Sequence, residues 1–467
     1  MFGFQIDPTC PLSNGKQLEK QIRTAILKGN LAAGEQLPPT RSLARELQIA
    51  RNTVIQVYEQ LIAEGYLISR EGAGTFVAEL GKLPKPKTTS ATLQKEKLKT
   101  ASEAIRRDVI SFDAGGIDHN SFPRTQFAKL MRDAFYVEDE NTFSYAYYTG
   151  HPRLKKAIRS YLYRMKGIEC NEEQIIVTAG TAGGMEILAK LFERKGNRII
   201  LEDPCISFVK KIFTDHNYGL CPVEVDGQGM KVEMLYRMES ADLIYVVPSH
   251  QFPLGGVLPA SRRIALLQYA SEQNAYILED DYDSEFRYKG EALQALHNLD
   301  PDRVIYLGSF SKIFAPSLRL GYMILPEHLC EQVEEQISST NLWAGPFEQV
   351  ALAEFLEQKL MDKHIYKMRK LYEAKRKQLI LGLINTFGSQ ITISGEDAGL
   401  HLLVTFYREL TQEDRQSFTE QGVEVDEVEE YATVKGKHGN RIVLGYGGLT
   451  LPQIEEGVRR LKRALDL

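Results

Sequence analysis

Four short apolar runs, separated by segments with helical periodicity, constrain the fold of this 467-residue chain more than any other feature. The runs begin at Arg198, Ala241, Tyr276 and Val304, and each has the length of a single strand. Alternation of strands with helices builds a mostly parallel sheet, whose binding sites lie at the carboxyl ends of the strands. We therefore expect an α/β fold with its chemistry where these runs end.

The last of these runs ends in residues suited to covalent chemistry. Ser309, Ser311 and Lys312 close it, and Arg319 follows seven positions after the lysine. Burial at a strand end lowers the pKa of a lysine, which frees its amine to attack an aldehyde, and the hydroxyls and the arginine suit an anion. A lysine at the end of a strand is more often simply exposed to solvent. The covalent interpretation therefore requires other functional residues elsewhere in the chain.

Those partners occur upstream. Asp280 and Tyr282 follow the preceding apolar run, and Gly180, Thr181 and Ala182 form a turn between a strand pattern and a helical pattern. Pyridoxal phosphate requires a lysine for its aldehyde, a carboxylate for its ring nitrogen, a hydroxyl near its phenolate and a phosphate cradle. Helix starts bind phosphate through backbone N–H groups. Each segment alone fits a solvated loop or a tight turn, but together they predict a pyridoxal phosphate site.

The first 80 residues predict a winged helix-turn-helix. Helical apolar spacing recurs over 18–27, 43–47 and 54–62, and residues 66–77 predict two strands around a glycine tip. A recognition helix presents its N-terminal side chains to base edges. The expected DNA contacts are Arg51, Asn52, Thr53 and Gln56 at the bases, Thr40 and Arg41 at phosphates, and Arg70 in the wing. A docking domain with solvated arginines is the alternative, because residues 1–80 hold eight basic and eight acidic side chains.

Residues 81–108 predict a basic flexible linker. They hold eight basic and three acidic side chains and few large apolar ones, so they cannot form a core. A flexible chain of this length reaches roughly 30 Å, and residues 91–107 could also form a polar helix. The rest of the chain has an excess of ten acidic side chains, so DNA attraction must be local.

Composition excludes other classes of protein. The five cysteines show no CxxC spacing, which argues against a disulfide framework or a zinc site, and we expect no metal. No run of eighteen apolar residues occurs, and the N-terminus lacks the pattern of a signal peptide. We therefore expect a cytoplasmic protein without a membrane partner.

Residues from about 111 to 467 resemble the fold-type I aminotransferases, and residues 12–78 resemble a GntR-type winged helix. The whole chain therefore resembles the MocR/GabR family of regulators. The segments that carry the resemblance are Leu37-Pro38-Pro39-Thr40-Arg41-Ser42-Leu43-Ala44, Ala63-Glu64-Gly65-Tyr66-Leu67, Pro248-Ser249-His250-Gln251-Phe252-Pro253, Glu279-Asp280-Asp281-Tyr282-Asp283-Ser284-Glu285-Phe286 and Ser309-Phe310-Ser311-Lys312. The implied domains are 1–80, the winged helix; 81–108, the linker; and 109–467, the aminotransferase-like effector domain, with a small α+β subdomain at roughly 345–467.

The resemblance also implies roles for residues. Lys312 would bond to the cofactor aldehyde, Asp280 would pair with the pyridine nitrogen, and Tyr282 would bond the phenolate oxygen. The phosphate would be held by Gly180, Thr181, Ala182, Ser309, Ser311 and Arg319. A tyrosine of the partner subunit often completes such a site, and Tyr147 or Tyr148 is the candidate. The family forms a head-to-tail, domain-swapped homodimer, so a homodimer is expected.

Departures from the family pattern bear on the ligand. Phe252 stands where aminotransferases carry an asparagine that bonds the phenolate, and Cys205-Ile206-Ser207-Phe208 lacks the arginine of GABA-sensing members. The stretch 425–431, where a carboxylate-binding arginine is expected, is acidic, which leaves Arg441 as the nearest alternative. A buried carboxylate requires a cationic partner, so an amine ligand or pyridoxal phosphate itself fits better than GABA. In the winged helix-turn-helix of residues 1–80, called the reader below, Ala50 stands where the family usually carries a helix-capping serine.

The leading hypothesis is a pyridoxal phosphate-dependent transcriptional regulator without net turnover. It would sense the cofactor itself or an amine or amino-acid effector, and control genes of vitamin B6 or amino-acid metabolism. The first alternative is an active aminotransferase that carries a DNA-binding domain. A scaffold that binds neither cofactor nor DNA is the second alternative.

Overall fold

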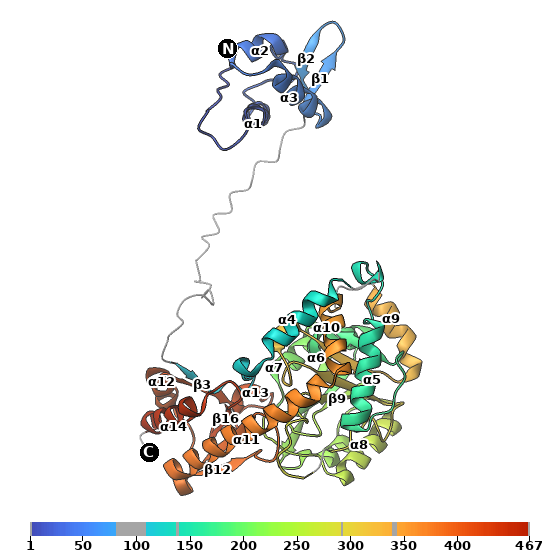
Figure 1. The fold of residues 1–467 in the computed structure, drawn as a ribbon, viewed down its shortest axis with the longest axis vertical. Coiled ribbons are helices and arrows are strands. Elements are labelled where there is room, and N and C mark those ends of the chain that lie inside the picture. Colours follow the sequence, from blue (N-terminus) through green and yellow to red (C-terminus); the bar gives the residue numbers. More distant parts are fainter. Residues whose placement is uncertain (1, 81–108, 137–139, 291–292, 339–342, 466–467) are drawn as a thin grey trace. The chain divides into compact units, whose positions relative to one another are not determined.

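The computed structural model describes residues 2–80, 109–136, 140–290, 293–338 and 343–465 (Figure 1). The chain divides into two compact units, residues 1–103 and 104–467, and each is described by itself. The predicted linker, including the polar helix considered for residues 91–107, lies outside the described residues. In the described ranges, no helix has the length and apolar character needed to span a membrane.

The first unit is a winged helix-turn-helix. Its elements are α1 (Asn14–Leu27), α2 (Thr40–Glu46), α3 (Arg51–Ala63), β1 (Leu67–Arg70) and β2 (Gly74–Val77). The Ser13 side chain caps α1, and α2 begins directly after Pro39, whereas α3 begins at Ala50 without a side-chain cap. Apolar residues of all three helices and of the antiparallel hairpin form one core, which fixes α3 beneath the wing.

An eight-stranded sheet forms the centre of the second unit. Its spatial order is β4 (Ile175–Thr178), β11 (Gly321–Ile324), β10 (Val304–Ser309), β9 (Tyr276–Asp281), β8 (Leu243–Val246), β5 (Arg198–Asp203), β6 (Gly219–Asp226) and β7 (Gly229–Met230). The pairs β10–β9, β9–β8, β8–β5 and β5–β6 are parallel, whereas β11 and β7 run antiparallel to their neighbours. The predicted mostly parallel sheet is therefore confirmed.

Helices cover both faces of this sheet because its strands are buried on both sides. Along β8, Leu243 and Tyr245 face one core cluster, and Ile244 and Val246 face another. The first cluster includes α6 (Gly180–Leu191), α7 (Ser207–Asp215) and α9 (Cys330–Ser338); the second includes α8 (Ala260–Gln273). A third cluster packs α4 (Arg124–Ala134) and α5 (Pro152–Lys166) against the C-terminal part.

The C-terminal part is α+β. Its antiparallel sheet has the order β12 (Ile391–Ser394), β13 (His401–Phe406), β16 (Arg441–Gly445) and β15 (Asp426–Glu427). Its helices are α10 (Pro346–Glu357), α11 (Leu360–Phe387), α12 (Gln412–Glu420), α13 (Val428–Tyr431) and α14 (Leu451–Leu465). The first strand of the unit, β3 (Ile110–Ser111), pairs in parallel with β14 (Val423–Glu424), so the start of the unit lies on this part.

Short 3-10 helices connect several of these elements. They are His119–Ser121, Glu140–Phe143, Val232–Arg237, Pro316–Leu318, Glu327–Leu329 and Gly388–Gln390.

Candidate cofactor site and DNA-binding face

A cavity of about 510 Å³ lies at the carboxyl ends of β9 and β10. It is lined by residues that the sequence predicted: Thr181, Ala182, Asp280, Tyr282, Ser309, Ser311, Lys312 and Arg319. Segments more than a hundred positions apart therefore meet at one edge of the sheet, as parallel strands require. The volume suits one organic cofactor and part of a small ligand.

Lys312 presents its amine to the mouth of this cavity. Its Nζ donates hydrogen bonds to the carbonyls of Gly115, at 2.7 Å, and Ala114, at 3.3 Å. Burial lowers the pKa of the Lys312 amine, whereas the negative charges of Asp113, Asp283 and Asp426 oppose that shift. The lowered pKa increases the neutral fraction that can attack an aldehyde.

Asp280 is the strongest sign that the cavity is built for a ligand. Tyr245 donates a hydrogen bond to Oδ2 of Asp280 at 2.8 Å, while Oδ1 is buried and has no partner among the described residues. Burial raises the pKa of Asp280 to about 7, and the charges of Asp281 and Asp283 add to the rise. A protonated ring nitrogen would give Oδ1 a partner and lower this pKa again.

The other end of the cavity fits a phosphate. Gly180 begins α6 at φ 75°, and a Cβ added there would lie 3.2 Å from Nη2 of Arg319. Arg319 donates to the carbonyl of Ala179 at 3.0 Å, which holds the guanidinium beside the helix start. Helix N–H groups, two serine hydroxyls and an arginine form the donor set that a phosphate dianion requires. The residues present therefore fit pyridoxal phosphate at both ends.

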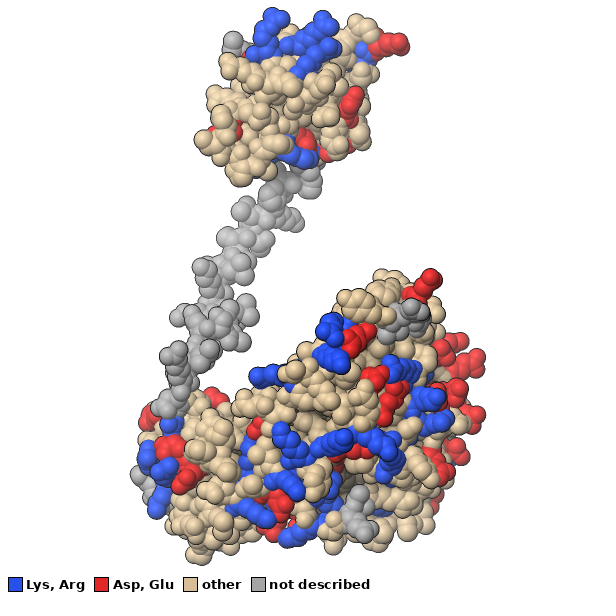
Figure 2. All heavy atoms as spheres, viewed as in Figure 1, with Lys and Arg blue, Asp and Glu red and all other residues tan. Residues whose placement is uncertain are grey.

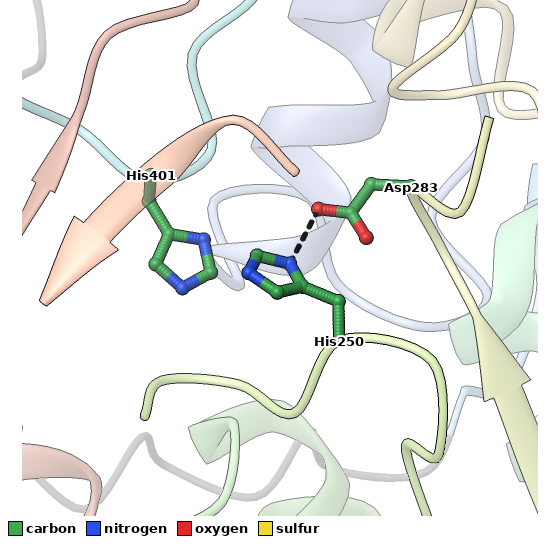
Figure 3. A group of neighbouring side chains, drawn as sticks. All are labelled: His250, Asp283 and His401. Atoms are coloured by element: carbon green, nitrogen blue, oxygen red, sulfur yellow. Dashed lines mark hydrogen bonds and ion pairs between the residues drawn. The ribbon is translucent and has the colours of Figure 1, made fainter. Parts of the chain in front are cut away.

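His250, Asp283 and His401 form a buried polar group (Figure 3). The hydroxyl of Tyr282 donates to the carbonyl of His250 at 3.1 Å, and His250 Nδ1 lies 3.1 Å from Oδ2 of Asp283. The ring of His401, at the start of β13, lies 4.7 Å from the ring of His250. The loop that follows β8 and the C-terminal sheet thus meet at His250.

The same trio is a group of potential metal ligands that the sequence did not predict. Donor atoms of His250, Asp283 and His401 lie within 4.8 Å of one another, and all three side chains are buried. Nδ1 of His250 is already bonded to Asp283. In this structure Asp283 and His250 therefore form a hydrogen-bonded support for Tyr282, against which the ring of His401 packs.

Two candidates from the sequence do not reach the cavity of the same chain. Tyr147 packs its ring 4.7 Å from that of His151, and its predicted role belongs to a partner subunit. Arg441, considered as a carboxylate clamp, directs Nη1 to Nδ1 of His438 at 3.2 Å. Arg441 is not one of the described residues that line the cavity.

The cavity also includes residues that sequence reasoning missed or treated only as departures. Tyr245 and the 113–115 loop were not predicted. Asp426 and Tyr431 lie in the acidic stretch 425–431, which the sequence analysis treated as a departure from the family pattern. Tyr245 carries a usable signal, because a tyrosine near the end of a buried parallel strand requires a polar partner. Nothing in the local sequence of the 113–115 loop indicates that it faces Lys312.

In the first unit, most of the predicted DNA contacts are exposed. Arg41, Arg51, Asn52, Gln56 and Arg70 are exposed, and Thr40 and Thr53 are half-buried. Figure 2 shows basic side chains of this unit gathered on the side that carries α2 and the β1–β2 hairpin. The guanidinium of Arg70 stacks 4.8 Å above the ring of Phe76, which directs it along the wing.

Comparison with known proteins identifies the family. A model described as aminotransferase class I and II matches residues 107–461, and one described as bacterial regulatory proteins, gntR family, matches residues 14–77. The probable rhizopine catabolism regulatory protein MocR of Rhizobium meliloti is 34% identical over 461 residues, which cover 96% of this chain and 93% of the relative. The chain belongs to the MocR family of transcriptional regulators.

Other relatives agree with this assignment. The pyridoxine biosynthesis transcriptional regulator PdxR of Corynebacterium glutamicum is 32% identical over 371 residues, covering 79% of each chain. Among solved structures, a kynurenine aminotransferase of Pyrococcus horikoshii matches 77% of this chain and 91% of its own, with a TM-score of 0.70 and 25% identity. This MocR-type regulator is therefore pyridoxal phosphate-dependent, with a DNA-binding GntR domain and an aminotransferase-like domain.

Proposed function

We propose that this MocR-type regulator changes its operator affinity when ligands occupy the cavity at Lys312. The observation that carries the proposal is the joint presence of Lys312 and the unpartnered Oδ1 of Asp280 in one cavity of a chain with a GntR domain. Ligand occupancy can shift an equilibrium only through contacts that differ between two states. Release of Lys312 from the carbonyls of Ala114 and Gly115 is such a difference.

Pyridoxal phosphate, when bound, supplies an aldehyde that amines attack and a ring that withdraws electrons. Lys312 would bond to that aldehyde, Asp280 would hold the proton of the ring nitrogen, and Tyr282 would donate to the phenolate oxygen. The phosphate would be bound by Gly180, Thr181, Ala182, Ser309, Ser311 and Arg319. Burial lowers the pKa of the Lys312 amine, and Tyr245 orients the Asp280 carboxylate.

We propose a sensing role without net turnover. Phe252 lines the cavity in the segment where aminotransferases carry their asparagine. Among the described lining residues, Lys312 and Arg319 are the cationic ones, and Arg319 is at the phosphate end. An amino-acid substrate would therefore meet no second arginine for its carboxylate within this chain. A working aminotransferase remains the alternative, supported by the intact set of Lys312, Asp280 and Tyr282.

In the reader, we propose direct base contacts from the N-terminal end of α3. Arg51, Asn52, Thr53 and Gln56 would face base edges, Thr40 and Arg41 would bind phosphates, and Arg70 would lie along the DNA backbone. Exposed donors at a helix start support these roles, because a recognition helix enters the major groove with that end.

We propose a homodimer in which the partner completes the cofactor site through its Tyr147. An aromatic group on the second unit supports an interface. The ring of Phe347 lies 4.3 Å from that of Phe135 and 5.1 Å from that of Phe143, and Tyr145 lies 5.6 Å from Trp343. Phe135, Phe143 and Tyr145 are 53%, 65% and 83% exposed, which is unusual for aromatic side chains gathered at one place. A linker of residues 81–108 is long enough for domain swapping.

The effector is proposed to be pyridoxal phosphate itself or an amine-bearing compound. The C. glutamicum relative is named for pyridoxine biosynthesis, so vitamin B6 genes are the first targets to test, followed by genes of amino-acid metabolism. Because a transcriptional regulator binds DNA, we propose a cytoplasmic location.

Substitution of Lys312 by alanine tests the proposal. Purified protein loaded with pyridoxal phosphate should show a visible absorbance band, and Lys312→Ala should lose it together with cofactor-dependent changes in affinity for DNA upstream of its own gene. Lys211→Ala is the control, because Lys211 is an exposed residue of α7. Absence of the band in the loaded parent protein would refute the cofactor role. Multiple turnover with an amino donor and a keto acid would instead favour the aminotransferase.

A further inference from the structure

The loop that follows β3 already holds an ammonium group. Nζ of Lys312 donates to the carbonyls of Gly115 and Ala114, at 2.7 and 3.3 Å, and the carboxylates of Asp113 and Asp426 line the same part of the cavity. The charges of both carboxylates stabilise the protonated lysine. The structure thus shows which chemical group this end of the cavity accepts.

Both carboxylates also fix the loop. Oδ1 of Asp113 accepts from the Gly115 N–H at 2.7 Å, and Oδ2 of Asp426 accepts from the Ala114 N–H at 3.2 Å. With their N–H groups engaged in this way, Ala114 and Gly115 offer their carbonyls to Lys312. Asp426 lies on β15, so the loop and the C-terminal sheet form this acceptor group together.

If Lys312 were bonded to the cofactor aldehyde, its nitrogen would no longer be an ammonium with three N–H donors. The carbonyls of Ala114 and Gly115 and the carboxylates of Asp113 and Asp426 would then lack this donor. Among the described lining residues the remaining cation is Arg319, which is bonded at the phosphate end. Ala114 is buried and Asp426 is half-buried, and acceptors at such positions are costly without a cationic partner, so this end favours a ligand with a positive charge.

We propose that Ala114, Gly115, Asp113 and Asp426 form an ammonium-binding subsite for the effector, and that the effector is a diamine rather than an amino acid. This inference rests on the proposed function, because it assumes a regulator loaded with cofactor. Ile206, Phe208, Phe252 and Tyr431 line the space beside the subsite. An apolar wall beside this acceptor-lined end fits an alkyl chain whose far ammonium would occupy the subsite while its other amine would face the cofactor aldehyde.

Three compounds with the same four-carbon skeleton test the proposal. Putrescine ends in a second ammonium, γ-aminobutyrate ends in a carboxylate, and n-butylamine ends in a methyl group. Their affinities for the loaded full-length protein are measured by calorimetry and by the change in cofactor absorbance. We expect putrescine to bind about tenfold tighter than n-butylamine or more, which is the ratio supplied by a charge-assisted hydrogen bond. γ-Aminobutyrate should bind most weakly.

Amide variants locate the effect. Asp426→Asn and Asp113→Asn keep the size and the acceptor oxygen but remove the charge, so each should reduce the preference for putrescine, and the double variant should abolish it. Asp215→Asn, on the exposed side of α7, should leave it unchanged. Equal binding of putrescine and γ-aminobutyrate, or a double variant with the parent preference, would overturn the subsite.

The outcomes separate this proposal from the proposed function. A loaded protein that binds none of the three compounds, yet changes its DNA affinity with pyridoxal phosphate alone, overturns the subsite and supports cofactor sensing. A parent protein that takes up no pyridoxal phosphate overturns both.

Discussion

The hydroxyl of Tyr245 holds the carboxylate of Asp280 by one oxygen only, through a hydrogen bond of 2.8 Å to Oδ2. Both side chains are buried, and the bond lowers the pKa of Asp280 against the larger effect of burial. The ionised carboxylate is the form that can retain a proton on the ring nitrogen of pyridoxal phosphate. Tyr245 is thus a positioning residue for the cofactor site.

Tyr245→Phe should raise the pKa of Asp280 and weaken cofactor binding most strongly below neutral pH. Loss of one buried hydrogen bond costs about 1–3 kcal/mol, which corresponds to roughly a tenfold to a hundredfold increase in the dissociation constant. The dissociation constant of pyridoxal phosphate, measured by fluorescence between pH 6 and 8, checks this prediction. Tyr269→Phe is the control, because the buried hydroxyl of Tyr269 has no partner in the described part of the chain. Equal affinities for parent and Tyr245→Phe at every pH would contradict the role.

Asp283→Asn should act in the opposite direction. The charge of Asp283 raises the pKa of Asp280, so its removal should extend cofactor binding to lower pH. The asparagine oxygen can still accept from Nδ1 of His250, which leaves the support of Tyr282 in place. The same fluorescence titration measures the shift, and a midpoint that moves to higher pH would be inconsistent with the electrostatic argument.

The cofactor-free protein should lose stability as the pH rises from about 4 to 8. Burial raises the pKa of Glu202 to about 8 and those of Glu279 and Asp280 to about 7. The folded state therefore binds more protons than the unfolded state between the ordinary carboxyl pKa and these values. The free energy of unfolding must fall through that window, because each extra proton contributes a slope of about 1.4 kcal/mol per pH unit.

Glu202→Gln should reduce this slope by up to about 1.4 kcal/mol per pH unit, which is the contribution of one proton. The amide keeps an acceptor for the N–H of Val247 and cannot titrate. Urea unfolding at several pH values measures the slope, with Glu169→Gln, at an exposed position, as the control. An unchanged slope in Glu202→Gln would show that Glu202 is ionised in both states.

Arg51 and Arg41 should affect DNA binding differently. Arg51→Ala removes a proposed base contact and should cost about 1–3 kcal/mol on specific DNA with little effect on non-specific DNA. Arg41→Ala removes a proposed phosphate contact and should weaken binding to all sequences. It should also reduce the slope of log affinity against log salt concentration by about one. Fluorescence anisotropy at several salt concentrations separates the two. Lys20→Ala, on the exposed side of α1, should match the parent.

Ala50→Ser should stabilise the reader. Ala50 is the N-cap of α3 and supplies no side-chain hydrogen bond, whereas Ser13 caps α1. A serine there can accept from an N–H of the first turn, which contributes about 1 kcal/mol. Slower hydrogen exchange of α3 amides in the full-length variant is the measurement, with exchange of α11 as the internal reference.

Sequence reasoning found the residues that lie at strand ends and helix starts. Lys312, Asp280 and Gly180 were predictable because parallel strands bring their carboxyl ends to one edge, so local sequence determines the location. Ala50 was predictable because capping depends on one side chain and the first turn of its helix.

The remaining site residues depend on contacts between distant segments. The 113–115 loop reaches Lys312 only because β3 pairs with β14, more than three hundred positions away. Likewise, the ring of His401 on β13 meets that of His250 in the loop after β8, about 150 positions earlier in the chain. Neither pairing leaves a periodic pattern, so no window of sequence reveals it. Tyr147 was assigned to the site by resemblance to the family, and its role there stays a prediction about the partner subunit.

The pairing of β3 with β14 also holds the backbone that follows the predicted linker. The predicted linker ends at residue 108, and the carbonyls that hold Lys312 belong to residues 114 and 115. The stretch of backbone that contacts the amine is thus continuous with the tether to the DNA-binding helices. A ligand bound to these carbonyls would therefore act on backbone only a few residues from the end of the predicted linker, rather than on the eight-stranded sheet.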